Sequence, residues 1–189
     1  MDQFDDLVAQ VAVVRTTSDR VAVAISGFGG SGKSTLAFRV RQRFEGDCTI
    51  VSTDLLYSRT PHSEDLVGMT DWATFETIAE SVRSADRLQY RGRTYFGDEF
   101  EVDEPMPSIV VFEGIRLLRP ELMSLYDLAV WIDCPQDVAT ARAKERNAKQ
   151  GDSDAEMALW DTLWNPIDAR YFAEYRPLEL ATFVYLFDA

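Results

Sequence analysis

One eight-residue segment limits what this chain can fold into more than any other. Residues 27–34 read Gly-Phe-Gly-Gly-Ser-Gly-Lys-Ser and match the pattern G-x-x-x-x-G-K-[ST] at every fixed position. Glycines allow backbone N–H groups to turn inward and surround a phosphate without a side-chain clash. The apolar run 21–25 precedes the segment, and apolar residues at helical spacing follow it over 31–44. The sequence therefore predicts a strand, a phosphate-binding loop and a helix, in that order.

The residues of this loop have separate expected roles. The helix that follows directs the positive end of its dipole at the bound anion. Lys33 is expected to reach the β- and γ-phosphates of a nucleotide, and the Ser34 hydroxyl to bind Mg²⁺. The predicted nucleotide-binding residues are Gly27, Gly29, Gly30, Ser31, Gly32, Lys33 and Ser34.

The rest of the chain alternates between short apolar runs and helical patterns. Further strands are predicted over 48–52, 109–112, 128–132 and 181–187, and helices over 2–14, 71–85, 135–149 and 154–174, the last despite Pro166. Strands that are apolar without alternation indicate a parallel sheet that helices cover on both faces. The predicted class is a three-layer α/β fold of one domain over 1–189. A small hairpin insertion is expected near 87–100 and a lid near 142–153.

Composition excludes several other classes of protein. A chain of 189 residues that is 46% hydrophobic and 27% charged is not a disordered chain. Its 19 Lys and Arg against 32 Asp and Glu give a net charge of −13, which argues against nucleic acid or anionic membranes as partners. No apolar run is long enough to span a membrane, and the acidic start lacks a signal-peptide pattern. Two cysteines and one histidine, His62, predict a reduced cytoplasmic protein without a structural zinc site.

Missing motifs narrow the class of nucleotide-binding protein. A GTPase needs an Asn-Lys-x-Asp motif, and the nearest segment, Asn-Ala-Lys-Gln at 147–150, fails at two positions. The Leu-Ser-Gly-Gly-Gln segment of transporter ATPases is not in the sequence, and 189 residues leave little room for a motor or a helicase. A small kinase is therefore the leading class, with ATP and Mg²⁺ as expected cofactors.

Two carboxylates follow predicted strands. Asp54 comes just after the strand 48–52, and Glu113 directly follows the apolar run 109–112. Ligands of a parallel sheet bind beyond the carboxyl ends of its strands, so both acids are expected beside the phosphate loop. One of them, Glu113, would serve the metal, and the other, Asp54, the acceptor hydroxyl.

A basic cluster lies on the predicted helix 135–149. Arg142, Arg146 and Lys149 recur at spacings of four and three, which places them on one helix face. Phosphoryl transfer requires cations over the transferring group, so the cluster is predicted to form a lid over the phosphates. The pair Trp160 and Trp164, at the same spacing of four, favours core packing over a base-stacking platform.

Taken together, these residues resemble the uridine kinase and phosphoribulokinase group of P-loop kinases. The resemblance covers most of residues 20–186 and extends the expected nucleotide-binding set to Thr35. The segments that carry it are 25–35, Asp54 with Tyr57, 112–115, Arg142 with Arg146, and a tail containing Leu159, Trp160, Trp164, Tyr171, Phe172, Arg176 and Pro177.

The resemblance implies a role for each matched residue. Asp54 would take the proton of the acceptor hydroxyl, and Glu113 would hold Mg²⁺ through water. Arg142 and Arg146 would form the lid. Tyr57, with Arg91 and Arg93 of the hairpin, would border the acceptor.

The acceptor itself stays open at this point. Where the family usually has Asp, Ser or Asp, Phe and Tyr in succession, residues 54–57 read Asp-Leu-Leu-Tyr. The family's His-Pro-Asp stretch is replaced by His-Ser-Glu-Asp at 62–65, and the hairpin contains no histidine. A nucleoside is the first expectation for the small-molecule acceptor. The alternatives are pantothenate, a sugar or a nicotinamide-type riboside, or a nucleotide-binding regulatory protein without phosphotransfer. The sequence also leaves open whether the chain forms a homo-oligomer.

Overall fold

The computed structural model describes residues 2–58 and 68–187, so His62 and most of the expected loop over 58–70 lie outside the described part. Strands are β1 (Val21–Ser26), β2 (Cys48–Ser52), β3 (Arg87–Arg93), β4 (Glu99–Pro105), β5 (Ile109–Gly114), β6 (Leu128–Asp133) and β7 (Phe183–Leu186). Helices are α1 (Gln3–Arg15), α2 (Lys33–Arg43), α3 (Trp72–Ser81), α4 (Gln136–Gln150), α5 (Asp154–Leu159), α6 (Asn165–Tyr175) and α7 (Pro177–Leu180). Two 3₁₀ turns, Thr53–Leu55 and Pro120–Leu125, and a π-helical turn, Trp160–Trp164, complete the described elements.

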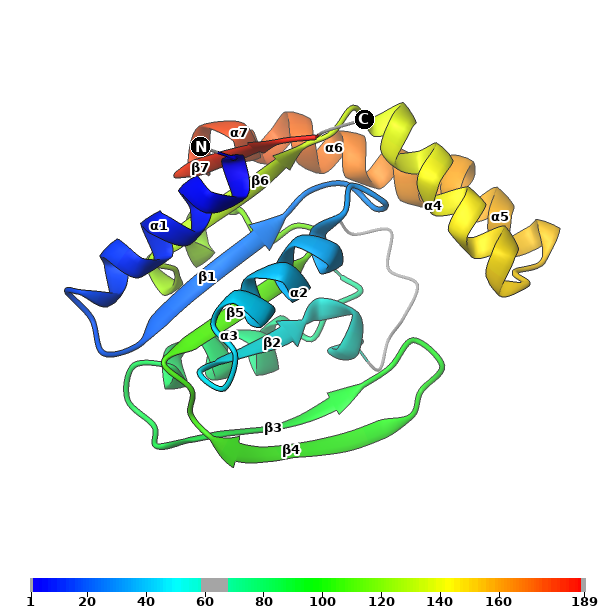
Figure 1. Cartoon of the computed structure of the whole chain (residues 1–189). Helices are drawn as coiled ribbons and strands as arrows, with labels where there is room; N and C mark the ends of the chain where they lie inside the picture. The colour runs from blue at the N-terminus through cyan, green and yellow to red at the C-terminus, as the bar shows by residue number, and fades with distance from the viewer. Residues whose placement is uncertain (1, 59–67, 188–189) are drawn as a thin grey trace.

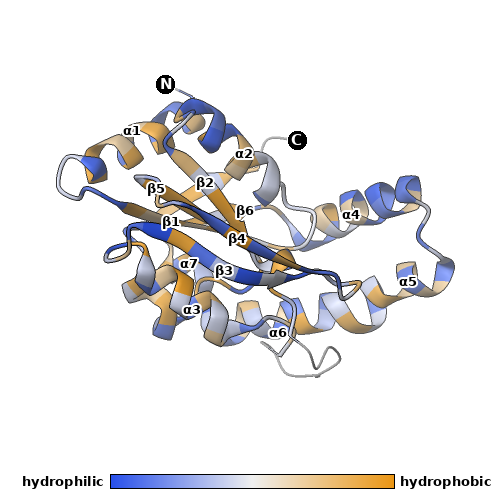
Figure 2. Cartoon of the chain, turned by 90° about the horizontal axis from the view of Figure 1, so that it is seen from below, coloured by the Kyte–Doolittle hydropathy of each residue, from blue (hydrophilic) through white to orange (hydrophobic). Residues whose placement is uncertain are grey.

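Five strands form one sheet in the order β2-β5-β1-β6-β7, and every neighbouring pair is parallel. All residues of the central strands β1 and β5 are buried, which explains their unbroken apolar runs. Figure 2 shows α1 and α2 on one face of the sheet and α3, α6 and α7 on the other. The predicted three-layer α/β fold with helices on both faces is confirmed.

The helices α4 and α5 extend beyond the main body at the end of the sheet to which β1 points (Figure 1). The segment after β1 is the predicted phosphate loop, Asp54 lies in the turn after β2, and Glu113 lies at the carboxyl end of β5 itself. The parallel order of these three strands therefore brings the predicted functional segments to one edge of the sheet.

The core fills both sides of the central strands. Phe112 of β5 packs edge-on against Phe75 of α3, with ring centroids 5.2 Å apart, and Trp131 of β6 is 1% exposed. Each such fully buried side chain stabilises the fold by about 2–3 kcal/mol.

Helix α3 begins where the sequence predicts and ends earlier. The Asp71 carboxylate accepts a hydrogen bond from the Thr74 N–H at 3.1 Å and caps the helix. The α-helix stops at Ser81, before the expected end at Ala85, and the Val82 and Ala85 carbonyls of the turns that follow accept hydrogen bonds from the Arg20 guanidinium.

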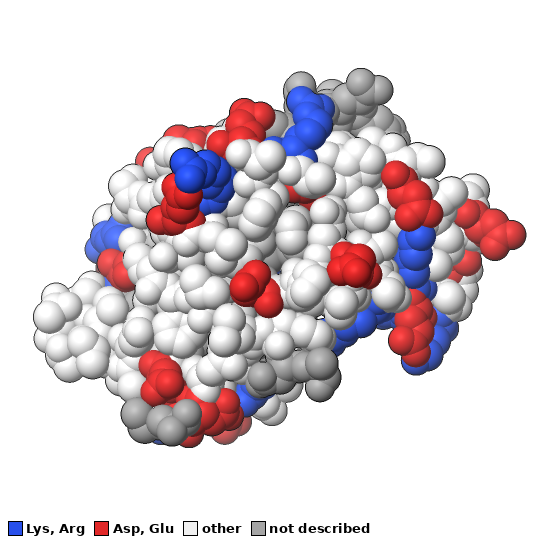
Figure 3. Space-filling model, turned by 90° about the horizontal axis from the view of Figure 1, so that it is seen from above, with Lys and Arg blue, Asp and Glu red and all other residues white. Residues whose placement is uncertain are grey.

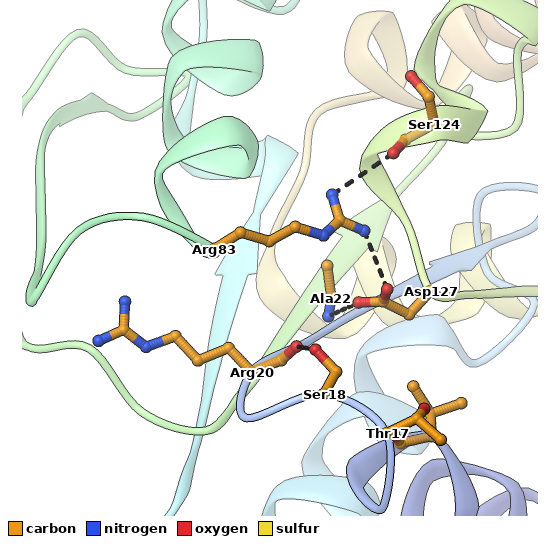
Figure 4. A network of polar contacts seen from close by, with 8 residues as sticks. Thr17, Ser18, Arg20, Ala22, Arg83, Ser124 and Asp127 are labelled. Carbon is orange, nitrogen blue, oxygen red and sulfur yellow. Dashed lines mark hydrogen bonds and ion pairs between the residues drawn. The ribbon is translucent and has the colours of Figure 1, made fainter.

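A polar network fastens the end of α3 to the sheet (Figure 4). The Asp127 carboxylate accepts from the Ala22 N–H of β1 at 2.8 Å and from the Arg83 guanidinium at 2.9 Å. Arg83 also donates to the Ser124 carbonyl at 3.4 Å. Arg83 therefore connects α3 to the turn before β6.

The predicted continuous helix over 154–174 is wrong in its middle. Pro166 has no N–H to donate, and its ring clashes with a regular α-helical turn before it. The chain resolves this conflict with the π-helical turn Trp160–Trp164, between α5 and α6. Helix α6 then continues to Tyr175.

The hairpin extends past its expected end. Strands β3 and β4 pair antiparallel with Arg87 opposite Pro105, so the pair reaches five residues beyond Phe100. It forms a separate two-stranded sheet, and α3 packs against β3.

The charge is dispersed on the face that Figure 3 shows. Acidic and basic side chains are scattered there over a largely uncharged surface, with acidic groups also near its middle, and form no continuous basic surface on that face. Over residues 2–58 and 68–187, no helix is both long and apolar enough to cross a membrane.

Asp47 makes folding sensitive to acid. Its carboxylate accepts from the Ser108 N–H at 2.9 Å and pairs with Arg15 at 2.7 Å, and these contacts hold its pKa below the usual value, the bonds from Ser108 contributing most. A lowered folded-state pKa stabilises the protein above pH 4 and loses that contribution as the pH falls. Because Asp47 is 40% exposed, Asp47→Asn should lower the free energy of unfolding at pH 7 by only about 0.5 kcal/mol. Urea unfolding should show this difference shrinking as the pH falls below about 4; a difference that stays the same throughout the acid range would contradict the assignment.

Candidate active site

A cavity of about 520 Å³ lies beside the phosphate loop, a volume that suits a small-molecule site. Five parts of the chain line it: the loop with the start of α2, the segment after β2, the hairpin tip, the end of β5 with the segment after it, and the segment from α4 to α6. The predicted site residues in its lining are Gly29, Gly30, Gly32, Lys33, Ser34, Thr35, Asp54, Tyr57, Glu113, Arg142 and Arg146.

The phosphate loop has the backbone that the motif requires. Gly30 has a φ of 88°, and a Cβ there would lie 2.1 Å from the Ala139 carbonyl oxygen, so glycine alone fits between the loop and α4. Two predicted residues, Gly27 and Ser31, do not line the cavity. A Cβ on Gly27 would lie 2.7 Å from the buried Ser31 hydroxyl. The two residues therefore pack against each other within the loop, on the side away from the cavity.

Lys33 is held inside the loop. Its Nζ donates to the Phe28 carbonyl at 2.8 Å, and the Phe28 ring packs against Trp131 and Phe172 in the core. Burial lowers the pKa of Lys33, and the nearby carboxylates of Glu113 and Asp54 oppose that change. A phosphate beside this ammonium group would stabilise its charged form.

Glu113 faces the loop from β5. Its carboxylate is 5% exposed and accepts hydrogen bonds from Ser34 Oγ at 3.2 Å and from Ser52 Oγ. Burial raises the pKa of this carboxyl group, and the bond from Ser52 opposes the rise.

A hydroxyl and a carboxylate side by side form the start of an oxygen donor set that suits Mg²⁺. Within the described part of the chain, no cluster of three or more Asp, Glu, His or Cys residues forms a complete metal cage. Magnesium ions are commonly bound by one or two protein groups together with nucleotide phosphates and water. Ser34 and Glu113 therefore fit the ion that the loop motif predicts.

Asp54 lies on the 3₁₀ turn directly after β2, with its backbone N–H bonded to Ser52 Oγ at 3.3 Å. It is exposed and lines the cavity, near enough to Lys33 and Glu113 to shift the pKa of both. Tyr57 follows it, and its N–H donates to the Arg93 carbonyl at 3.0 Å. Burial raises the pKa of the Tyr57 hydroxyl, with Asp54 adding to the rise, so this tyrosine is a neutral hydrogen-bonding group at physiological pH.

The hairpin meets the cavity through residues other than the predicted ones. Arg91 pairs with Glu101 on the outside of the hairpin, and Arg93 stands opposite Glu99 in the strand register. Neither arginine lines the cavity, so the prediction that both lie there is corrected. Residues two apart in a strand share one face, and on this face the two arginines stand opposite the glutamates of β4. The tip supplies Tyr95 and Phe96 to the cavity instead.

The basic face of α4 divides into two parts. Arg142 and Arg146 line the cavity, whereas Lys149 pairs with Glu145 at 2.7 Å and lies outside the lining. The Arg142 guanidinium lies over the Phe187 ring at 4.8 Å, and Arg146 donates to the Asn147 side chain at 3.0 Å. The structure therefore leaves two of the three basic residues of this face in a position to meet a phosphate.

The tryptophan pair lines the cavity, and the expectation of core packing is wrong. Trp160 and Trp164 are half-buried in its wall. A Cβ on Gly29 would lie 2.8 Å from the Trp160 ring, so the ring covers the phosphate loop where glycine leaves space. The helical spacing placed both rings on one face, and only the tertiary fold directs that face at the loop.

Sequence reasoning missed a buried ion pair in the cavity wall. Arg116, two residues after β5, donates to Asp168 of α6 at 2.8 Å, and the two side chains are 3% and 7% exposed. Arg116 has a φ of 63°, a left-handed conformation that costs about 1 kcal/mol or more in a residue other than glycine. No local pattern marks either residue, because 52 positions separate them in the sequence.

Comparison with known proteins agrees with this geometry. No family model matches the chain. A curated protein named uridine kinase from Clostridium novyi (strain NT) is 27% identical over 145 residues, which cover 69% of both chains. A protein described as a possible uridine kinase from Bacillus stearothermophilus has the same fold, with a TM-score of 0.70, 18% identity and 97% of each chain covered.

A candidate fructose transport system kinase from Silicibacter sp. TM1040 gives a TM-score of 0.69 at 20% identity, covering 95% of this chain and 98% of that one. At 18–20% identity, the likeness to these two solved structures shows the fold alone. The three-layer α/β fold is that of the P-loop NTPases, and in sequence and architecture the chain resembles the uridine kinase-like group of P-loop kinases, as its motifs predicted.

Proposed function

We propose that the protein is an ATP- and Mg²⁺-dependent kinase that phosphorylates a hydroxyl group of a small molecule, with a nucleoside as the first choice of acceptor. The observation that supports it is one cavity that contains both halves of the required chemistry. The phosphate loop, Ser34 and Glu113 occupy one end, and the exposed carboxylate of Asp54 stands near them. A protein that only bound a nucleotide would not need the second carboxylate.

The chain's own residues divide the work as follows. Backbone N–H groups of the loop and Lys33 bind the phosphates, and Ser34 with Glu113 would hold Mg²⁺, which neutralises charge on phosphate oxygens when bound. Asp54 orients the acceptor hydroxyl and takes its proton. Arg142 and Arg146 stabilise the charge of the transferring group, while the α4–α6 segment restricts water. Catalysis then consists of positioning and charge neutralisation.

The test is a direct search for transfer. The protein is incubated with ATP, Mg²⁺ and a pooled library of nucleosides, sugars, pantothenate and nicotinamide riboside. Mass spectrometry should find one acceptor class about 80 Da heavier, the mass of one added phosphoryl group. ATP binding without transfer to any acceptor would instead favour a nucleotide-binding regulatory protein.

Lys33→Ala tests the nucleotide end of the cavity. The variant removes a charged donor to the phosphates, a contact worth about 1.5–3 kcal/mol, so ATP affinity should fall by about tenfold or more and turnover should fall with it. Calorimetric titration with ATP and Mg²⁺ measures the affinity. Lys144→Ala is the matched control, since Lys144 pairs with Asp161 outside the cavity. Unchanged ATP affinity in the Lys33 variant would refute the phosphate-loop assignment.

A further inference from the structure

We infer that Trp160 keeps water away from the transferring phosphoryl group, and that this residue thereby makes the phosphate go to the acceptor hydroxyl and not to water. The inference rests on the proposed kinase function and adds a selectivity that the phosphate-binding, metal-binding and proton-accepting residues do not supply. It concerns the phosphate end of the cavity and does not depend on which acceptor binds.

Two reactions compete for the same phosphoryl group. In transfer, the acceptor oxygen bonds to the γ-phosphorus of ATP, the bond from that phosphorus to the β–γ bridging oxygen breaks, ADP leaves, and the hydroxyl proton passes to Asp54. In hydrolysis, a water oxygen forms the new bond, the same bridging bond breaks, and the products are ADP and inorganic phosphate. Because Asp54 is exposed, its carboxylate can take a proton from water as well as from an acceptor. The wall of the cavity must therefore exclude water from the phosphates.

Most of the wall near the phosphates attracts water. The arm, residues 136–164, contributes six side chains with charged or amide groups to the cavity lining: Arg142, Arg146, Asn147, Gln150, Asp152 and Glu156. Its large apolar side chains in the lining are Leu159, Trp160 and Trp164. An apolar barrier to water in this part of the wall therefore has to come from one of these three side chains.

The Trp160 ring is the one that contacts the phosphate loop. A Cβ on Gly29 would lie 2.8 Å from two carbons of this ring, and no other described residue beyond the chain neighbours of Gly29 comes within 4 Å of that position. The next residue, Gly30, is closed off by α4, since a Cβ there would lie 2.1 Å from the Ala139 carbonyl oxygen. The backbone N–H groups of the loop surround the phosphates, so the ring stands at the edge of the phosphate-binding space.

The π-helical turn holds the ring in this place. The Asn165 N–H donates to the Trp160 carbonyl, five residues earlier, and Asp161 pairs with Lys144 of α4 at 2.7 Å. Among the described residues, the hydrophobic core and the partly buried side chains packed against it do not include Trp160. The ring is therefore positioned for the cavity and not for the core, and π-helical turns occur frequently at functional sites.

The first experiment measures phosphate release from ATP with no acceptor present. Wild-type protein, Trp160→Ala and Trp160→Phe are each incubated with ATP and Mg²⁺. Trp160→Ala should release inorganic phosphate about tenfold faster than wild type, because water then reaches the phosphates. Trp160→Phe keeps an aromatic ring near Gly29 and should stay within about threefold of wild type. Calorimetric titration should show that both variants still bind ATP, since the loop and Lys33 are unchanged.

Trp164→Ala is the matched control. Trp164 is also half-buried, belongs to the same π-helical turn and lines the same cavity, but its ring is not within 4 Å of a Cβ on Gly29. Its removal should leave phosphate release without an acceptor at the wild-type rate. An equal increase in both alanine variants would point to a general loosening of the arm and would overturn the inference. Unchanged release in Trp160→Ala with ATP binding retained would overturn it as well.

The second experiment uses the wild-type protein and does not depend on the folding of a variant. Transfer to uridine, or to another acceptor that the pooled library identifies, should be at least about 100-fold faster than phosphate release from ATP alone. Similar rates would show that the wall does not exclude water, which would overturn the inference and leave a kinase. Transfer to no member of the library would overturn the kinase function and the inference with it.

Discussion

Asp54→Asn is expected to lower acceptor phosphorylation by about 10²- to 10⁴-fold, the usual contribution of a general base, while ATP affinity stays at the wild-type value. Asparagine keeps the shape of the side chain and removes its ability to take a proton. Asp54 is exposed and lies on the turn after β2, so the substitution should not disturb the core. Single-turnover transfer and ATP titration, measured on the same sample, separate the two effects.

Asp133 provides the matched control for this experiment. It is also an exposed aspartate at the carboxyl end of a parallel strand, β6, but it does not line the cavity. Asp133→Asn should retain full activity. If Asp54→Asn phosphorylated the acceptor at the wild-type rate, another group would have to accept the proton.

Arg146→Ala is expected to lower kcat by about 10²- to 10³-fold, comparable to the loss of one donor that stabilises developing charge in a transition state. The guanidinium lines the cavity near Lys33, where its charge lowers the lysine pKa, so it faces the phosphate end. An interaction that forms mainly in the transition state changes kcat more than KM. Steady-state kinetics with saturating acceptor provide the measurement.

Lys149→Ala is the control on the same helix. Lys149 carries the same charge, but it pairs with Glu145 and lies outside the cavity lining, so its removal should leave kcat unchanged. If Arg146→Ala and Arg142→Ala both kept full kcat, the prediction that α4 forms a lid over the phosphates would be wrong, and its basic face would be an ordinary solvent-exposed surface.

The three-layer fold could be predicted because it rests on local patterns. An unbroken apolar run marks a strand that is buried on both faces, as in β1 and β5, and a capping residue such as Asp71 marks the start of a helix. The predicted helix bounds fail for two different reasons. The turns after α3 place their Val82 and Ala85 carbonyls against Arg20, a contact from 62 positions before Val82 that no local pattern reveals. In the helix predicted over 154–174, Pro166 is a local signal, and the chain accommodates it with the π-helical turn Trp160–Trp164.

The site divides in the same way. Residues at or just after the carboxyl ends of strands, such as Lys33, Asp54 and Glu113, could be placed because parallel strands end at one edge of the sheet. Residues on the hairpin and on the helices could not be placed, because their direction depends on how those elements pack. Arg91 was expected at the cavity but pairs with Glu101 outside its lining, whereas Trp160 was expected in the core and lies over Gly29.

The amino-acid sequence alone predicted the position of the glycine-rich loop, the strand-end carboxylates and the class of the fold, because each depends on residues close together in the chain. The tertiary structure decided which other side chains line the cavity beside them. Arg116 and Asp168 show the physical reason: neither residue has a local signature, and only the contact of α6 with the segment after β5 removes both from water and makes them partners.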